Sequence, residues 1–377
     1  MKISKQAWLG TVAGAMALGL MGAAPAAQAK TYDVTFYVAA MGGHFAHAVC
    51  TIDPSSPDPI KVKSLDKIDI GDHDSHPVHD ARIDATNRNL MFYSTYHLDK
   101  ATGKTHVGKV DLKTGKVIKD IDVDTPANVK NTSHMYCASG QTKDFFMPIT
   151  MSSPAYIDVF RKSDLKRMHT VFLEDTPADV KVPYKFYHGT TSPDMKKFFI
   201  TINESDKPYG ELVGKVHMEM LDAQALSQGK VKVLYKGVAD GNKKTTCSFR
   251  QYFSHNGKLI ANATGDLLFI IDANNLKVLA AQPMGKLEET HDAIFTPDDK
   301  YVVATSRTKV LNPGVKPTDD PGPDDYLMDG QLKLYDVQAK KFIGKPVSVC
   351  QTCHKKEGVD EHAILCGLDA NWGKTTK

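Results

Sequence analysis

Short runs of β-branched and aromatic residues recur along the chain, and polar turn residues separate them. Clear examples lie at residues 34–38, 90–93, 197–201 and 301–305. Residues of these types favour strands, whereas the Gly, Pro, Asn and Asp between them favour turns. After residue 30, no long apolar pattern follows the 3.6-residue period of an amphipathic helix. The pattern therefore predicts an all-β protein.

Two motifs alternate along these strands with a spacing of roughly 50–60 residues. One is an apolar strand that ends in Asp and is followed by a turn and a basic strand, as at residues 110–117 and 271–278. The other opens on His and leads through a strand to a Pro-Asp turn, and residues 291–301 are its clearest copy. A repeating unit of this length, with four strands, is typical of a β-propeller blade.

The two ends of the chain complete each other in this repeat. The last copy of the His motif, at residues 362–366, has almost no chain after it, and the first Asp motif, at Asp53, has almost no chain before it. We therefore expect the C-terminal strand to close a blade begun by the N-terminal strands. The copies predict a single propeller of six four-stranded blades, and blades of the more usual length of about 45 residues would make it seven.

The first thirty residues have the pattern of a secretory signal peptide. Lys2 and Lys5 precede an apolar stretch of small residues at 7–24, and a small-x-small cleavage sequence ends at Ala29. A permanent membrane anchor is the alternative. We expect cleavage near Ala29 and export to a bacterial periplasm, without stable membrane insertion. Residues 30–377 would then form one propeller domain.

Composition and charge exclude several other classes. The chain has 47 Lys and Arg against 44 Asp and Glu, which gives a formal net charge of +3. This small excess argues against nucleic acid or an anionic membrane surface as a partner. Hydrophobic residues are 41% and charged residues 24% of the chain. These fractions are ordinary for a globular protein and exclude wholesale disorder and a polytopic membrane protein.

The most specific chemical signal is the sequence from Cys350 to His354, which reads C-x-x-C-H. This motif attaches c-type haem. Cys350 and Cys353 would bond to the two vinyl groups, and His354 would be the proximal ligand of the iron. An export signal agrees with this chemistry, because bacteria attach c-type haem outside the cytoplasm. The sequence therefore predicts one covalent haem c.

Two other uses of the cysteine pair stay open. A redox C-x-x-C motif favours a helix N-terminus in a βαβ unit, and half of a zinc site needs partners, for which only Cys366 and His362 lie nearby. The motif lies in a predicted loop at 344–361, between the last strand of one blade and the first strand of the closing blade. This segment is too short for an ordinary cytochrome c domain. A second predicted loop, rich in Pro, Gly and Asp, spans 311–330 and projects on the same face.

Alignment of the repeats places histidines at the start of several innermost strands. These strands line the central channel of a propeller, so we expect the imidazoles to gather round its mouth on the face of the haem loop. They are candidates for the distal haem ligand, or for a ring that binds a second metal, copper or iron. A repeated structural role is the alternative. The residues are His79, His134, His291, His362 and, one residue out of register, His188.

The other cysteines lie within or beside strand motifs. They are Cys50, Cys137, Cys247 and Cys366. We expect them to be buried as small apolar residues. An exported protein also permits disulfides, and the pairing among these four cannot be predicted from the sequence.

The repeated pattern of a strand, a Thr/Ser-Pro-Asp turn, a strand, Asp and Thr-Gly-Lys resembles the YVTN-type β-propeller superfamily. Residues 192–194 and 111–116 carry its turn motifs. This superfamily includes the cytochrome d1-type, amine-dehydrogenase-like and nitrous-oxide-reductase propellers. The resemblance covers nearly the whole mature chain and implies the fold rather than the chemistry. The nitrous-oxide-reductase family holds a copper cluster with central histidines, but this chain lacks the cupredoxin domain of that family.

These observations predict a periplasmic c-type cytochrome on a propeller scaffold, which transfers electrons to a redox protein or a companion subunit. The alternative is an oxidoreductase in which the haem acts together with a metal or substrate site at the histidine ring. A third hypothesis is a non-redox interaction propeller whose C-x-x-C-H sequence is incidental.

Overall fold

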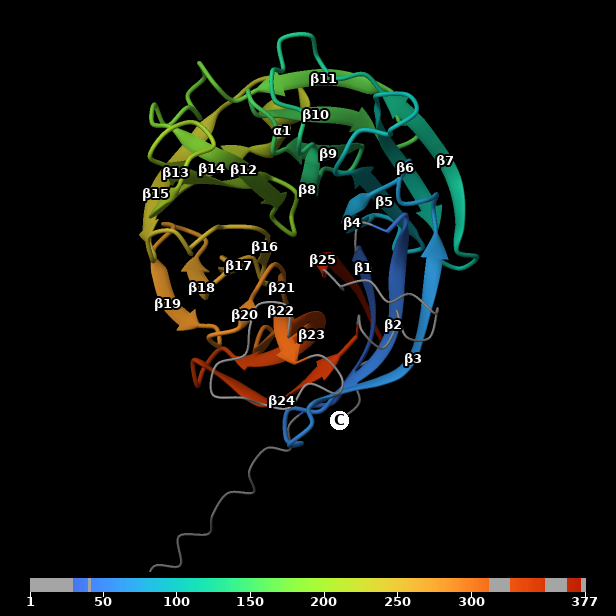
Figure 1. Ribbon diagram of the computed structural model, residues 1–377, viewed down its shortest axis with the longest axis vertical. Coiled ribbons are helices and arrows are strands. Elements are labelled where there is room, and N and C mark those ends of the chain that lie inside the picture. Colours follow the sequence, from blue (N-terminus) through green and yellow to red (C-terminus); the bar gives the residue numbers. More distant parts are fainter. Residues whose placement is uncertain (1–29, 40–41, 312–325, 350–364, 374–377) are drawn as a thin grey trace, which may run out of the picture.

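The strands of the chain form a six-bladed β-propeller. The computed structural model describes residues 30–39, 42–311, 326–349 and 365–373. Within these segments, six antiparallel sheets surround a central axis (Figure 1). This arrangement confirms the all-β propeller with six blades, and the seven-bladed alternative is wrong. In the same segments, no helix is long and apolar enough to cross a membrane.

Each blade is a meander that runs from an innermost to an outermost strand. The first three blades along the chain are β25 (Cys366–Trp372), β1 (Tyr32–Ala39), β2 (His44–Ile52) and β3 (Ile60–Asp69); then β4 (Val78–Ile83), β5 (Leu90–Thr95), β6 (Thr105–Asp111) and β7 (Lys116–Val123); then β8 (Tyr136–Gln141), β9 (Phe145–Thr150), β10 (Tyr156–Arg161) and β11 (Arg167–Phe172).

The remaining three blades follow the same plan. They are β12 (Tyr184–Thr191), β13 (Lys197–Ser205), β14 (Leu212–Asp222) and β15 (Val233–Asp240); then β16 (Gln251–Phe253), β17 (Leu259–Ala263), β18 (Leu267–Asp272) and β19 (Val278–Pro283); then β20 (Glu288–Glu289) and β21 (Ala293–Phe295), which both pair with β22 (Tyr301–Leu311), followed by β23 (Tyr326–Asp336) and β24 (Lys341–Ser348). A short helix, α1 (Ala223–Ser227), follows β14. Long strands such as β14, with 11 residues, explain why six blades use this much chain.

Burial falls from the axis outward. The innermost strands β4 and β8 are buried at every residue, whereas the outer strand β7 is exposed over half its length. The core lies between neighbouring blades, where Phe36 of β1 belongs to one apolar cluster with Leu334 of β23. These inner strands are therefore covered on both faces and do not alternate between buried and exposed residues, although they carry polar side chains such as His79 and Asp80.

The C-terminal strand closes the ring, as the sequence predicts. β25 pairs antiparallel with β1, with Val34 opposite Trp372 and Phe36 opposite Ala370. Pairing of the two chain ends turns an open series of blades into a closed one and covers the inner edge of β1.

The predicted haem loop emerges between β24 and β25. Pairing of β24 with β23 continues as far as Ser348, so residues 344–348, which the sequence analysis placed in the loop, belong to a strand. Residues 350–364, with Cys350, Cys353, His354 and His362, lie outside the described residues. Of the second predicted loop, residues 326–330 belong to β23, and residues 312–325 lie outside the described part.

Candidate functional site

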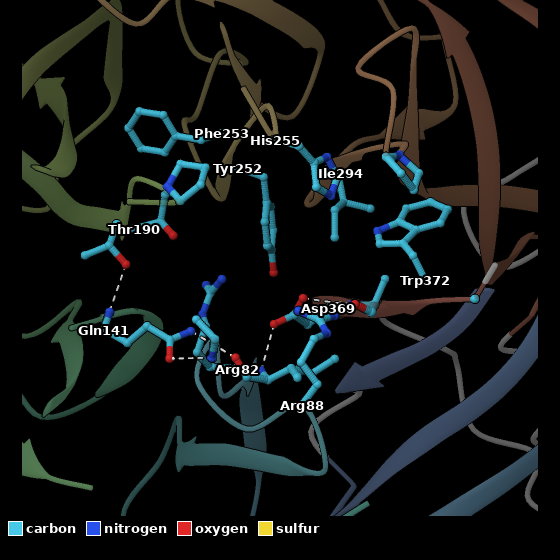
Figure 2. A pocket seen from close by; sticks show the side chains of 17 residues that line it. Arg82, Arg88, Gln141, Thr190, Tyr252, Phe253, His255, Ile294, Asp369 and Trp372 are labelled. Carbon is cyan, nitrogen blue, oxygen red and sulfur yellow. Dashed lines mark hydrogen bonds between the residues drawn. The ribbon is translucent and has the colours of Figure 1, made fainter. Parts of the chain in front are cut away.

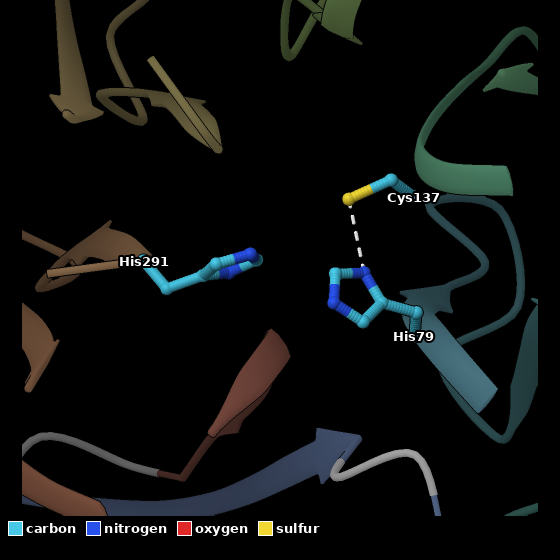
Figure 3. A group of neighbouring side chains, drawn as sticks. All are labelled: His79, Cys137 and His291. Carbon is cyan, nitrogen blue, oxygen red and sulfur yellow. Dashed lines mark hydrogen bonds between the residues drawn. The ribbon is translucent and has the colours of Figure 1, made fainter. Parts of the chain in front are cut away.

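A buried cluster of two imidazoles and one thiol lies at one mouth of the central channel. His79 belongs to β4, Cys137 to β8, and His291 precedes β21; Figure 3 shows the three side chains pointing toward one another. The sulfur of Cys137 lies 2.9 Å from Nδ1 of His79. One nitrogen or sulfur atom from each side chain lies within 4.8 Å of the others. Their exposed fractions are 3%, 0% and 1% for His79, Cys137 and His291.

Backbone irregularities bring His79 and Cys137 to equivalent positions. The pairing of β4 with β5 shifts between Val78 and Asp80, and that of β8 with β9 shifts between Tyr136 and Ala138. The skipped residue in each strand, His79 or Cys137, is therefore a bulge residue, whose side chain leaves the regular alternation. Sequence alignment of the repeats put His134 at the position that Cys137 occupies in the fold.

A carboxylate orients the imidazole of His291. Nδ1 of His291 donates to Oδ2 of Asp292 at 2.8 Å, which leaves Nε2 as the nitrogen with a lone pair. The same carboxylate accepts the backbone N–H groups of Gly367 at 3.1 Å and Leu368 at 2.9 Å. Asp292 thereby ties the closing strand β25 to the cluster. An imidazole held by a carboxylate through its second nitrogen is the usual arrangement at protein metal sites.

Arg250 ties the backbones of the cluster together. Its guanidinium is 1% exposed, forms an ion pair with Asp80 at 2.6 Å and donates to the carbonyl oxygens of His79 and Cys137. The sequence analysis missed this residue because its repeat copy is weak. Phe249 and Arg250 stand where other copies have His followed by Asp, so an Arg at that position was the available signal.

Burial keeps the cluster in its neutral forms when no metal is bound. It lowers the pKa of His79 and of His291 well below the usual range for histidine, and neighbouring cationic groups lower both further. It also raises the pKa of the Cys137 thiol, partly opposed by Arg250. Two imidazoles with free lone pairs thus face a thiol in a site shielded from water.

The other predicted site residues lie in three different places. His134 sits at the rim, where its ring centroid is 4.9 Å from that of Tyr96. His188 is fully buried on β12, and its Nδ1 lies 3.1 Å from the carbonyl oxygen of Ser248. His188 is not in the three-residue cluster, although its ring contacts Phe249, which in turn stacks on His291. His354, His362 and the C-x-x-C cysteines lie outside the described residues.

The cluster lines part of a cavity of about 280 Å³. Besides the cluster, its lining consists of Tyr96, His97, His134, Met151, Phe249 and Arg307. Nε of Arg307 donates to the carbonyl oxygen of Leu365 at 3.3 Å. Leu365 is the first described residue after segment 350–364, so the lining of the cavity is joined directly to the end of that segment.

The opposite mouth of the channel has a different character. A cavity of about 500 Å³ there is lined by residues at and after the ends of the innermost strands. Figure 2 shows the Arg82 guanidinium and the Tyr252 ring facing its centre, and the guanidinium carbon lies 5.0 Å from the ring centroid. Oδ2 of Asp369 accepts the backbone N–H of Ile83 at 2.8 Å. This mouth combines a cation with aromatic surface, in contrast to the nitrogen and sulfur ligand atoms of the first mouth.

Another group of potential ligands, His76, His106 and Asp120, is held together by ion pairs. Nδ1 of His106 lies 2.7 Å from Asp120, and its Nε2 lies 3.3 Å from Asp99. Both ring nitrogens of His106 are therefore engaged by carboxylates, which favours a structural role for this group.

Three of the cysteines outside the motif match the expectation of buried thiols. Cys50, Cys137 and Cys247 are buried and form no disulfide in the described part of the chain. Cys366, at the start of β25, is also buried. For Cys137, the sequence predicted a packing role or a disulfide, whereas the fold places it in the cluster with His79 and His291.

Comparisons with known proteins find only distant similarity. No protein-family model and no curated protein matches this chain. Among solved structures, hydrazine synthase from Kuenenia stuttgartiensis is 14% identical, with a TM-score of 0.45, and the match covers 72% of this chain and 65% of that one. A functionally unknown protein from Desulfotomaculum acetoxidans is also 14% identical, with a TM-score of 0.45, over 89% of this chain and 99% of that one. Similarity at this level says nothing about the chemistry of the site.

Proposed function

We propose that this protein is an exported c-type cytochrome on a propeller scaffold, which passes single electrons to a redox protein or a companion subunit. The observation that carries the proposal is the C-x-x-C-H sequence in the segment that joins β24 to β25. Cys350 and Cys353 would hold the haem covalently, and His354 would be its proximal ligand. When bound, the haem supplies a one-electron couple of Fe(II) and Fe(III).

The flanks of the motif-bearing segment support this proposal. On one side, the backbone N–H of Val349 donates to the carbonyl oxygen of Gly330 at 2.9 Å. On the other side, Arg307 holds the carbonyl oxygen of Leu365 and also lines the cavity above the cluster. Two anchored strand ends can hold a cofactor against one face of the propeller without a separate haem domain.

The rim of the cavity offers two imidazoles for the sixth position of the iron. His97 and His134 both line the cavity, and burial lowers the pKa of each below its usual value, so the rings are neutral at physiological pH. Nδ1 of His97 donates to the carbonyl oxygen of Ser133 at 2.7 Å, which leaves Nε2 as its ligand atom. A haem with two imidazole ligands is suited to electron relay rather than to binding small molecules.

Spectroscopy on the haem-loaded protein tests the proposal. We expect the wild type, produced in a bacterium that matures c-type cytochromes, to show a low-spin spectrum that carbon monoxide does not change. The double variant Cys350→Ala/Cys353→Ala should lose covalent haem, whereas the control Cys247→Ala should retain it. A wild-type protein that has the circular dichroism of a folded β protein but carries no covalent haem would contradict the proposal.

A second candidate function is favoured by the cavity itself. A space of about 280 Å³ between the buried cluster and the rim can admit a small molecule. In that case the protein is an oxidoreductase, and the haem exchanges electrons with a substrate bound beside His79 and His291. Binding of carbon monoxide to the reduced haem would favour this function over simple relay.

A further inference from the structure

We propose that His79, Cys137 and His291 bind one copper ion through two imidazole nitrogens and one thiolate. Copper binding depends only on these described residues. Its use as a redox partner of the haem rests on the function proposed above. The inference stands on the convergence of the three side chains, on their supports and on the soft character of the ligand set.

The three ligand atoms nearly have the spacing that a metal requires. Bonds of about 2.0 Å to nitrogen and about 2.3 Å to sulfur place ligand atoms about 3.3–3.7 Å apart in tetrahedral or trigonal geometry. The cluster atoms lie within 4.8 Å of one another, and sulfur and Nδ1 of His79 are 2.9 Å apart. Moving this one pair apart by somewhat less than 1 Å would admit the ion, so a rotamer adjustment is sufficient.

Supports around the ligands fix their orientation. The ring of His79 stacks on Tyr96 with centroids 4.2 Å apart, and that of His291 stacks on Phe249 at 4.6 Å. Asp292 holds the second nitrogen of His291, and Arg250 binds the carbonyl oxygens of both His79 and Cys137. Such outer contacts set the tautomer and the ring plane before a metal arrives.

The ligand set favours copper over zinc. Thiolate and imidazole suit both metals, but structural zinc almost always takes four ligands in a tetrahedron. Of the nearby carboxylates, Asp292 is engaged by His291 and two backbone N–H groups, and Oδ1 of Asp80 is paired with Arg250, whereas Oδ2 of Asp80 has no hydrogen-bond partner among the described residues. The thioether of Met151 is a soft donor that lines the same cavity, and Met151 and Cys247 belong to one apolar cluster with Cys137. Two His and one Cys with a weak Met is the arrangement of electron-transfer copper sites.

Copper at this position would complete an electron path between the buried cluster and the haem segment. Cu(I) becomes Cu(II) by giving one electron, and haem Fe(III) becomes Fe(II) by accepting it, so the exchange balances without another reactant. When the metal binds, the S–H bond of Cys137 breaks, a bond from sulfur to copper forms, and the proton is released to solvent. Arg307 lines the cavity and donates to the carbonyl oxygen of Leu365, the first described residue after residues 350–364.

Metal content and spectroscopy of purified protein test the copper site. The wild type, loaded with copper and passed through a desalting column, should retain about one copper per chain. In the oxidised state it should show an intense visible thiolate-to-copper band and the matching electron paramagnetic resonance signal. Cys137→Ser should lose both the band and the copper. Cys247→Ser, a matched change of another buried thiol, should keep both.

The haem-free variant separates this inference from the proposed function. Cys350→Ala/Cys353→Ala should still bind one copper with the same band, even if the wild type proves to carry no haem. Retention of copper and band by Cys137→Ser would overturn the copper site. Selective binding of zinc by the wild type, or no metal at all, would also overturn it. If Cys137→Ser does not fold, a copper(I) competition titration of the wild type alone gives the same decision.

Discussion

At the scale of single residues, the orientation of two bulge residues creates the cluster. His79 and Cys137 occupy the positions at which the pairing of β4 and β8 shifts. A residue placed there turns away from the normal alternation of a strand and can point along the channel. His134, three residues before Cys137, reaches only the rim. The position of the bulge in β4 and in β8 therefore determines which residue of each strand points into the cluster.

The hydrogen bond from Nδ1 of His291 to Asp292 can be tested by substitution. Asp292→Asn replaces the carboxylate that accepts from Nδ1 of His291, so copper binding should weaken about 10–100-fold. A copper(I) competition titration measures the change, and a shift of the visible band should accompany it. Asp369→Asn, which changes a buried carboxylate at the opposite mouth, is the control and should leave copper affinity and band unchanged. Equal effects of both variants would contradict an orienting role for Asp292.

The surroundings of His106, which lies outside the cluster, predict how the free energy of unfolding depends on pH. His106 faces Asp120 at 2.7 Å, Asp99 at 3.3 Å and Asp122 at 3.7 Å, and His76 shares Asp120 at 3.4 Å. The hydrogen bond to Asp120 is the main cause of the raised pKa of His106. The folded state therefore favours the protonated ring. The stabilisation that the protonated ring gives is complete below the pKa of histidine in the unfolded chain, about 6.5. It is lost as the pH rises through the higher pKa that His106 has in the folded state.

We expect the free energy of unfolding of the wild type to fall between neutral and mildly alkaline pH. His106→Gln should make this fall smaller. Urea denaturation at several pH values measures it. Parallel profiles of wild type and variant would contradict the assignment. The control His169→Gln changes an exposed imidazole on β11 and should preserve the wild-type profile.

At the scale of elements, β25 both closes the ring and supports the site. Its second residue, Gly367, has a backbone φ of +69°, which favours glycine. A Cβ at this position would lie 2.5 Å from the carbonyl oxygen of His79. The closing strand and a proposed metal ligand are therefore in close backbone contact, so closure of the ring and geometry of the cluster are coupled.

Two glycine variants separate backbone strain from this contact. Gly103→Ala, in an exposed turn, has the same φ of +69° but open space around its Cβ, so it should cost only about 1–2 kcal/mol. Gly367→Ala should cost more, because it adds a clash with the backbone of His79, and it should also lower copper affinity. Chemical denaturation and copper titration give the two measurements. Equal destabilisation by the two variants, with unchanged copper binding, would show that the contact is unimportant.

At the scale of the whole molecule, the sequence predicts the fold because each blade repeats a local pattern. Strand runs, Pro-Asp turns and the half-blades at the two ends determine the blade count and its closure. The channel histidines His79 and His291 follow from the same repeat. Cys137 was missed because the repeat alignment took His134, three residues earlier, as the counterpart of His79. Arg250 was missed because its repeat copy is weak, and its partner Asp80 is 170 residues away in the chain.

The two mouths of the channel differ in the chemistry of the side chains that line them. Nitrogen and sulfur ligand atoms lie at one end, beside Arg307, and the Arg82 and Tyr252 cavity lies at the other. The proposed electron transfer would therefore take place at one face, where residues 350–364 join β24 to β25. A redox partner or companion subunit would dock on that face.

The central claim is that this propeller carries a covalent haem, and intact-mass spectrometry of the wild type tests it most directly. The protein should be purified from a bacterium that matures c-type cytochromes and measured under denaturing conditions, which remove non-covalent ligands. We expect a mass equal to that of the chain from Lys30 onward plus one haem. A folded, exported protein whose mass equals that of the polypeptide alone would contradict it.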